Sequence, residues 1–110
     1  MPQDFPLVPT VRAIHIDLKG MQPRMERLLQ LLRLYADAGY NTLLIEWEDM
    51  FPWKEEKFRR AEAYTEKDVQ MLAERAAGLN LEIIPLIQSY GHLENVLRHE
   101  KYAACRELDW

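Results

Sequence analysis

The chain has 110 residues, of which 48% are hydrophobic and 29% are charged, and its formal net charge at pH 7 is −4. This composition is typical of one small globular domain, and the acidic balance argues against nucleic acid as a partner, because phosphate binding requires a basic surface. No apolar run approaches the ~18 residues of a membrane span, and the first residues lack the basic and apolar regions of a signal peptide, so we expect a cytoplasmic protein without a membrane partner.

The first of three similar units begins with a short apolar strand at residues 11–18 (VRAIHIDL). A loop follows at Lys19 and Gly20, and a helix is predicted to begin near Pro23, because proline fits the first helical turn. Apolar residues then recur at helical spacing: Met25, Leu28, Leu29, Leu32 and Tyr35. Gly39 stands where this helix should end.

The second unit opens at Asn41 with a buried-strand pattern (TLLIEW), which a long loop over residues 48–64 follows. The charged run over residues 54–60 in this loop is typical of an exposed surface. Thr65 predicts the start of a helix, with Asp68 three residues later as its capping-box partner. Residues 78–80 predict the end of that helix.

The third unit contains a strand over residues 81–87 (LEIIPLI), a polar loop over 88–92, and helical segments near 93–98 and 102–108. Pro85 has no N–H for a strand ladder, so we expect a bulge there. The only cysteine, Cys105, can form no internal disulfide, and we expect it to be an inert helix residue.

Alternating strands and helices predict an α/β fold with a parallel sheet covered by helices. Strands that begin at Val11, Asn41 and Leu81 have the spacing of a (β/α)8 TIM barrel, in which about 250 residues form eight units. The chain would then hold the first three βα units of such a barrel. The alternative is a small complete α/β domain, although its three-stranded sheet would have two open edges.

Polar and aromatic side chains gather where the three strands end, which is the edge at which parallel sheets bind ligands. They are His15, Asp17 and Lys19, then Glu46, Trp47, Glu48 and Asp49, and finally Gln88, Tyr90 and His92. Carboxylates that bind hydroxyl groups and aromatic rings that cover the apolar side of a sugar are typical of carbohydrate sites. The sequence therefore favours a carbohydrate site on this rim.

Each of these residues also has another interpretation. Because His15 and Asp17 lie on one face of their strand, they could form the metal pair of a metal-dependent TIM-barrel hydrolase, or a structural hydrogen bond. The acidic residues that follow the second strand could begin a solvated loop, and Trp47 and Trp53 could be packing residues. A non-catalytic α/β binding module is the third possibility for the chain as a whole.

Four segments cover nearly the whole chain: VRAIHIDLKG (11–20), NTLLIEWEDMFPW (41–53), AYTEKDV (63–69) and EIIPLIQSYGHLENVLRHEKYA (82–103). In this order and spacing they resemble glycoside hydrolase family 20, the β-N-acetylhexosaminidases, and within it the hexosaminidase D branch. The resemblance implies that residues 1–110 form the N-terminal part of a glycoside hydrolase catalytic barrel, which stops before strand four.

The resemblance also implies the reaction: hydrolysis of terminal β-linked N-acetylglucosamine or N-acetylgalactosamine, without a cofactor or metal. In the family, the 2-acetamido oxygen of the substrate attacks the anomeric carbon, and the configuration is retained. An Asp-Glu pair at the end of strand four orients the acetamido group and acts as general acid and base. This chain contains no such fourth strand, so we expect it to be inactive alone.

Three residues match functional positions of the family. Arg12 corresponds to an arginine that binds hydroxyls of the terminal sugar, although the strand direction places it away from the rim. Asp49 and His92 correspond to an aspartate and a histidine that form a polar relay, which supports the catalytic acid. We also expect Asp17 and Glu46 to bind or support the substrate.

Overall fold

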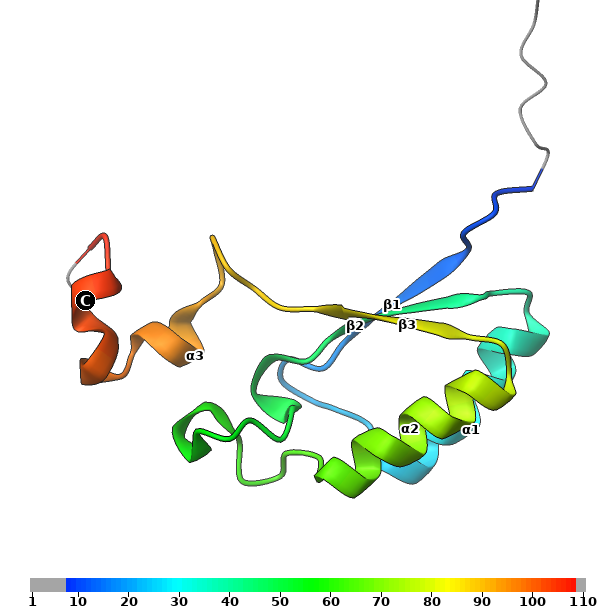
Figure 1. Ribbon diagram of the computed structural model, residues 1–110, viewed down its shortest axis with the longest axis horizontal. Coiled ribbons are helices and arrows are strands. Elements are labelled where there is room, and N and C mark those ends of the chain that lie inside the picture. The colour runs from blue at the N-terminus through cyan, green and yellow to red at the C-terminus, as the bar shows by residue number, and fades with distance from the viewer. Residues whose placement is uncertain (1–7, 109–110) are drawn as a thin grey trace, which may run out of the picture.

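The computed structural model describes residues 8–108, which form three parallel strands and the helices that follow them (Figure 1). The strands are β1 (Ala13–Asp17), β2 (Thr42–Glu46) and β3 (Glu82–Leu86), in the sheet order β1-β2-β3. Both pairs are parallel, and Glu46 lies opposite Asp17 on one side and Leu86 on the other. The predicted α/β class, with parallel strands that alternate with helices, is therefore confirmed.

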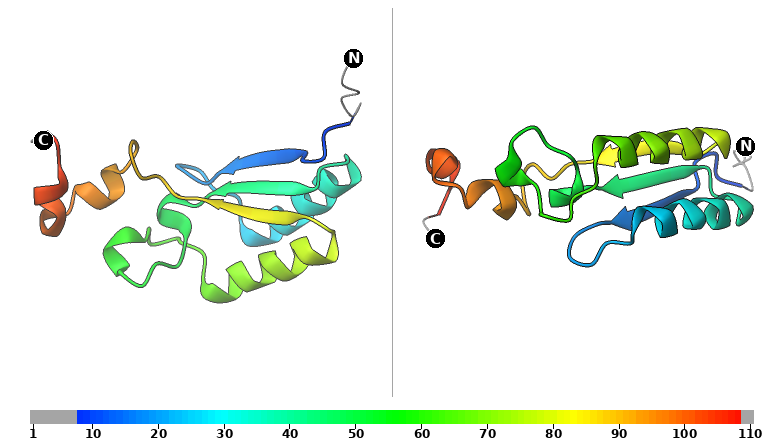
Figure 2. Two further views of the ribbon diagram at one scale, coloured as in Figure 1. Left: turned by 45° about the horizontal axis from the view of Figure 1, so that its top comes forward. Right: turned by 90° about the horizontal axis from the view of Figure 1, so that it is seen from below.

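Two long helices cover one face of this sheet (Figure 2). Helix α1 (Met25–Asp37) precedes Gly39, whose φ of 91° ends the helix as predicted. Helix α2 (Glu66–Gly78) begins with the predicted capping box, in which Thr65 and Asp68 each accept a hydrogen bond from the other's backbone N–H. Asn80, with a φ of 55°, adopts the left-handed conformation after α2.

Short helices occupy the remaining segments. The 3₁₀ helices η1 (Glu48–Met50) and η2 (Glu56–Phe58) lie within the predicted long loop, and α3 (Glu94–Leu97) and η3 (Glu100–Cys105) follow β3. Cys105 ends η3 and is exposed. No helix within residues 8–108 has the length and apolar character that crossing a membrane requires.

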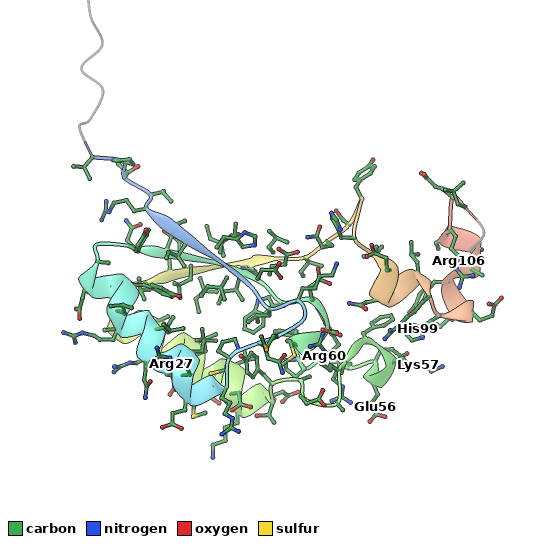
Figure 3. All side chains as sticks on the ribbon, turned by 180° about the vertical axis from the view of Figure 1, so that it is seen from behind. Arg27, Glu56, Lys57, Arg60, His99 and Arg106 are labelled. Atoms are coloured by element: carbon green, nitrogen blue, oxygen red, sulfur yellow. The ribbon has the colours of Figure 1, made fainter. Side chains whose placement is uncertain are left out.

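An aromatic cluster connects η2 with η3. The ring of Phe58 lies 5.7 Å from the ring of His99 and 5.6 Å from that of Tyr102, measured between centroids. The ring nitrogen Nε2 of His99 also lies 3.0 Å from the carbonyl oxygen of Lys57, and Figure 3 shows these two residues side by side. These contacts hold the segment after β3 against the long loop after β2.

The bulge predicted at Pro85 is wrong. β3 pairs with β2 in one continuous register, in which Pro85 lies opposite Ile45. The Glu82 N–H donates to the Asn41 carbonyl at 2.9 Å, and N–H groups alternate sides along a strand, so the nitrogen of Pro85 faces away from β2. Within the described part of the chain β3 is an edge strand, and its proline interrupts no hydrogen bond.

The core lies between the sheet and the helices α1 and α2. Leu43 and Ile45 of β2 are fully buried there, together with Leu28 of α1 and Leu72 of α2. Trp47 is also part of this core at 4% exposure, which confirms its interpretation as a packing residue. Because side chains alternate along a strand, the residues between these apolar ones point to the other face of the sheet.

Candidate functional site

Glu46, the last residue of β2, is the centre of the candidate site. Its Oε2 lies 2.9 Å from Nε2 of His15 on β1, and its Oε1 accepts a hydrogen bond from Nε2 of Gln88, just after β3. The side chain thus joins the ends of all three strands. Glu46 is buried, at 8% exposure. The contacts form because His15 and Glu46 point to the same face of the sheet, the face away from the helices.

These contacts lower the pKa of Glu46. The hydrogen bond from Gln88 is the largest cause, burial acts in the opposite direction, and the hydrogen bond from His15 lowers the pKa further. Glu46 is therefore ionised at neutral pH. An ionised carboxylate only accepts hydrogen bonds, so Nε2 of His15 must carry the hydrogen in this contact.

The partner of His15 is Glu46 and not Asp17, which corrects the structural His–Asp hydrogen bond considered for β1. Oδ1 of Asp17 instead accepts a hydrogen bond of 2.8 Å from the backbone N–H of Lys19, at the start of the loop after β1. Over residues 8–108, no three histidine, cysteine, aspartate or glutamate side chains gather into a group that could hold a metal ion.

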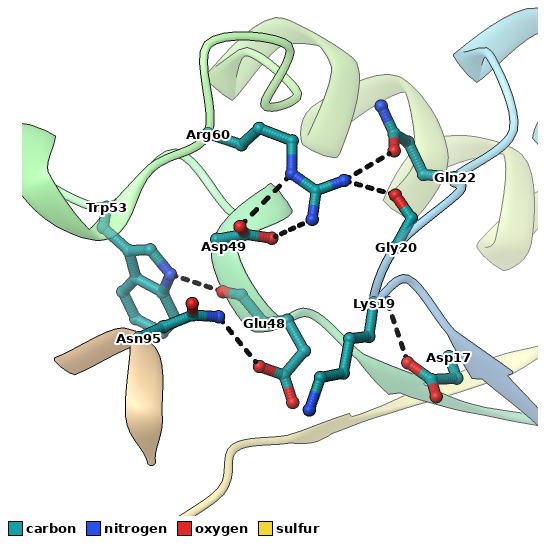
Figure 4. Close-up of polar contacts among 9 residues, drawn as sticks. All are labelled: Asp17, Lys19, Gly20, Gln22, Glu48, Asp49, Trp53, Arg60 and Asn95. Carbon is teal, nitrogen blue, oxygen red and sulfur yellow. Dashed lines mark hydrogen bonds and ion pairs between the residues drawn. The ribbon is translucent and has the colours of Figure 1, made fainter. Parts of the chain in front are cut away.

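Glu48 lies two residues after Glu46 and has a φ of 48°, which residues other than glycine seldom adopt. Its Oε2 accepts a hydrogen bond of 3.3 Å from Nδ2 of Asn95 on α3, whereas its Oε1 is buried without a partner in the described part of the chain. The backbone carbonyl of Glu48 accepts a hydrogen bond of 2.9 Å from the indole of Trp53 (Figure 4). Glu48 therefore does not begin a solvated loop.

Burial raises the pKa of Glu48, and the side chain of Glu46 raises it further. The positive charge of Lys19 and the hydrogen bond from Asn95 act in the opposite direction. The two glutamates that follow one another on the same rim thus have pKa values that are shifted apart. Such a separation is common where one carboxyl group acts as an acid and its neighbour as a base.

A cavity of about 220 Å³ lies beside Glu48, between the segment after β2 and the segment after β3. Its polar lining comes from Glu48, Gln88, His92 and Asn95, and Trp53 contributes to its apolar walls. His92 adopts a φ of 55° at this place. His92 and Glu48 therefore line the same cavity. Tyr90, which the sequence also placed on this rim, is fully exposed.

Asp49 faces Arg60. Its Oδ1 lies 3.1 Å from Nη2 of Arg60, and its Oδ2 accepts a hydrogen bond of 3.2 Å from Nε. The same guanidinium donates to the Gly20 carbonyl and to Oε1 of Gln22, in the loop after β1 (Figure 4). The described contacts include none between Asp49 and His92. The prediction that residues 54–60 are exposed is wrong for Arg60, whose side chain is 27% exposed.

Arg12 lies just before β1, at the opposite end of the sheet from the rim. Its Nε donates to the Gly39 carbonyl at 2.6 Å, and its Nη1 donates to the Pro9 carbonyl at 2.8 Å. The backbone N–H of Arg12 also donates to Oδ1 of Asn41 at 2.8 Å. The structure thus does not bring Arg12 to the residues around Glu46.

No family model matches this chain. Its sequence is similar to that of human Hexosaminidase D, with 42% identity over 101 residues, and to that of bovine Hexosaminidase D, with 39% identity over 100 residues. Each alignment covers 89% of this chain but only 21% of the human and 29% of the bovine protein. The chain thus spans less than a third of the length of these curated relatives. Over that part, it is related in sequence to hexosaminidases.

Proposed function

We propose that this chain is part of a β-N-acetylhexosaminidase of glycoside hydrolase family 20 and that its strands belong to a (β/α)8 barrel. The similarity to Hexosaminidase D supports the proposal. The observation that carries it is the junction of Glu46 with His15 and Gln88. This junction lies at the carboxyl ends of three parallel strands, where barrels of this kind bind their substrates.

The substrate would be a glycan with a terminal β-linked N-acetylglucosamine or N-acetylgalactosamine. The reaction would retain the anomeric configuration, because the 2-acetamido group of the substrate supplies the nucleophile. The general acid and the aspartate that orients the acetamido group would come from an Asp-Glu pair after a fourth strand. The residues of this chain would bind the sugar and support that pair.

The contacts of the candidate residues suggest two kinds of role, binding of the sugar and stabilisation of the fold around it. Glu46, Asp17 and His92 would lie beside the bound sugar, since all three come from the rim. Asp49 would act through its ion pair with Arg60, which fixes the loops behind the rim. Arg12 would stabilise the start of the first strand, because it would have to give up two hydrogen bonds to carbonyl groups before it could bind a sugar.

A chimera tests this function directly. Residues of this chain replace the matching ~100 residues of human Hexosaminidase D, and the hydrolysis of an aryl N-acetyl-β-hexosaminide is measured. We expect an active chimera, in which His92→Ala lowers kcat at least ~10-fold, as is usual when a group that supports acid–base catalysis is lost. The control is Glu56→Gln, because Glu56 is exposed on η2. A folded chimera without activity would contradict the proposal.

A further inference from the structure

Glu48 follows Glu46 by two residues, and each side chain shifts the pKa of the other, but their hydrogen bonds differ. Glu46 receives one donor from each neighbouring strand segment, through His15 and Gln88. Among residues 8–108, Glu48 receives a single donor, Asn95, and its Oε1 is buried with none. A buried carboxylate oxygen without a donor is unfavourable, and so is a second negative charge beside the first.

We propose that Glu48 is a neutral carboxylic acid, that its Oε1–H donates to the Glu46 carboxylate, and that this bond positions the rim for binding a neutral sugar. The proton gives Oε1 a partner and removes the second charge. A continuous hydrogen-bonded chain then runs from His15 through Glu46 and Glu48 to Asn95, from β1 across β2 to α3. The identity of the ligand rests on the proposed function, whereas the position of the proton rests on these contacts alone.

The backbone of Glu48 supports a positioning role. Its φ of 48° is strained for a residue with a side chain, and such conformations persist only where the surroundings fix them. Here the hydrogen bond from the Trp53 indole to the Glu48 carbonyl holds the backbone, while Asn95 holds the carboxyl group. These two hydrogen bonds fix the Glu48 side chain in spite of the strained backbone.

Charged and titratable groups surround Glu48 on several elements. Lys19, in the loop after β1, points toward the carboxyl group in Figure 4, and its charge favours the ionised form. Glu46 favours the neutral form, and so does burial, which is the largest effect. His92, after β3, lines the same cavity, while His15 contacts Glu46 and not Glu48. The raised pKa of Glu48 is the net result.

Ionisation of Glu48 would place a second negative charge against Glu46 and break the proposed hydrogen bond between the two side chains, whereas the bond from Asn95 would remain. The cavity beside Glu48 would change shape, because the Glu48 side chain forms part of its lining. Its apolar wall at Trp53 suits the apolar side of a sugar ring. Sugar binding should therefore weaken as the pH rises through the pKa of Glu48.

NMR titration of the 110-residue chain, labelled with ¹³C at the glutamate carboxyl groups, tests the position of the proton. We expect Glu48 to titrate above the ordinary glutamate pKa, and Glu46→Gln to lower that pKa, because an amide replaces the carboxylate acceptor. Glu56→Gln, on the exposed η2, is the matched control and should leave it unchanged. A pKa for Glu48 at or below the ordinary value in the unsubstituted chain overturns the proposal without any variant.

The positioning role has its own test, which measures the binding of N-acetylglucosamine to the chimera with human Hexosaminidase D on either side of the pKa measured for Glu48. We expect binding to weaken at least ~3-fold above that pKa in the unsubstituted chimera, and to become independent of pH in the chimera with Glu48→Gln, a neutral side chain of the same shape. Equal binding at both pH values overturns the role. A raised pKa of Glu48, together with a folded chimera that binds no sugar, would overturn the carbohydrate function and leave the position of the proton established.

Discussion

The guanidinium of Arg60 lies 3.1 Å from Oδ1 of Asp49, and the same group reaches Gly20 and Gln22 in the loop after β1. One side chain thus connects the end of β2 with the loops that follow β1 and β2. The side chain of Asp49 is 13% exposed and that of Arg60 is 27% exposed, so solvent screens the pair less than a surface ion pair. Asp49 therefore stabilises the loops after β1 and β2 through its ion pair with Arg60.

Arg60→Ala should lower the free energy of unfolding by about 1–3 kcal/mol, because it leaves the Asp49 carboxylate with too few donors. The coupling with Asp49→Asn in a double-mutant cycle should be about 1 kcal/mol, measured by urea unfolding. Arg59→Ala is the matched control and should cost less than ~0.5 kcal/mol, since the partner of Arg59, Glu56, is 86% exposed. Equal losses for Arg59 and Arg60 would contradict the role of Arg60 as a connector.

The capping box of α2 should make a pH-dependent contribution to the free energy of unfolding. Thr65→Ala should destabilise the chain by about 1 kcal/mol at neutral pH, since it removes the side-chain oxygen that accepts from the Asp68 N–H. Hydrogen bonds with Thr65 lower the pKa of Asp68. The contribution of Asp68 is thus present above its ordinary pKa and is lost as the pH falls through its folded-state pKa.

Urea unfolding at neutral pH and again in acid measures this contribution. The difference in unfolding free energy between the unsubstituted chain and Thr65→Ala should become smaller in acid, where Asp68 is protonated and accepts hydrogen bonds less well. A difference that is the same at both pH values would contradict the coupling between Thr65 and Asp68.

Replacing Gly39, which follows α1, and Gly78, which lies in α2, by alanine should change the stability of the chain in opposite directions. Gly39 has a φ of 91°, and a Cβ built there meets nothing within 4 Å. The free-energy cost of a side chain at this position therefore comes from the backbone conformation alone. Gly39→Ala should destabilise by about 1–2 kcal/mol. Gly78, in the last turn of α2, also has open space but lacks a positive φ, so Gly78→Ala should stabilise by up to about 1 kcal/mol. Thermal unfolding of both variants checks the two signs.

The sequence predicted the elements well, because their signals are local. The strand at Thr42–Glu46 follows from a continuous apolar run, and the ends of the helices follow from Gly39, Asn80 and the Thr65 cap, all within a few residues of the feature they determine. Pro85 is the exception. Its effect depends on whether a neighbour pairs with β3 on its outer side, which a local pattern does not contain.

The partners of the site residues were less predictable, because they come from distant parts of the chain. His15 and Gln88 lie 31 and 42 residues from Glu46, and Arg60 lies 11 residues from Asp49. The family resemblance selected Asp49 and not Glu48. The alternation of Glu46 and Glu48 at the end of an apolar strand was a signal for their proximity, but their different environments arise only when α3 and the strand ends come together.

The opposite pKa shifts of Glu46 and Glu48 predict two different slopes of stability against pH. The pKa of Glu46 is lowered, so its contribution is present above the ordinary glutamate pKa and is lost as the pH falls through its folded-state pKa. The pKa of Glu48 is raised, so the unfolded chain releases this proton first. Stability therefore declines as the pH rises from the ordinary glutamate pKa to the folded-state pKa of Glu48.

Urea unfolding of the unsubstituted chain, Glu46→Gln and Glu48→Gln over a series of pH values separates these slopes. Glu46→Gln should lower stability at neutral pH and reduce the loss in acid, because the variant has no carboxylate to protonate there. Glu48→Gln should instead remove the decline above the ordinary glutamate pKa, so its stability relative to the unsubstituted chain rises with pH. Since both variants replace a carboxyl by an amide on the same rim, each is the control for the other, and parallel pH profiles would contradict the separate roles of the two glutamates.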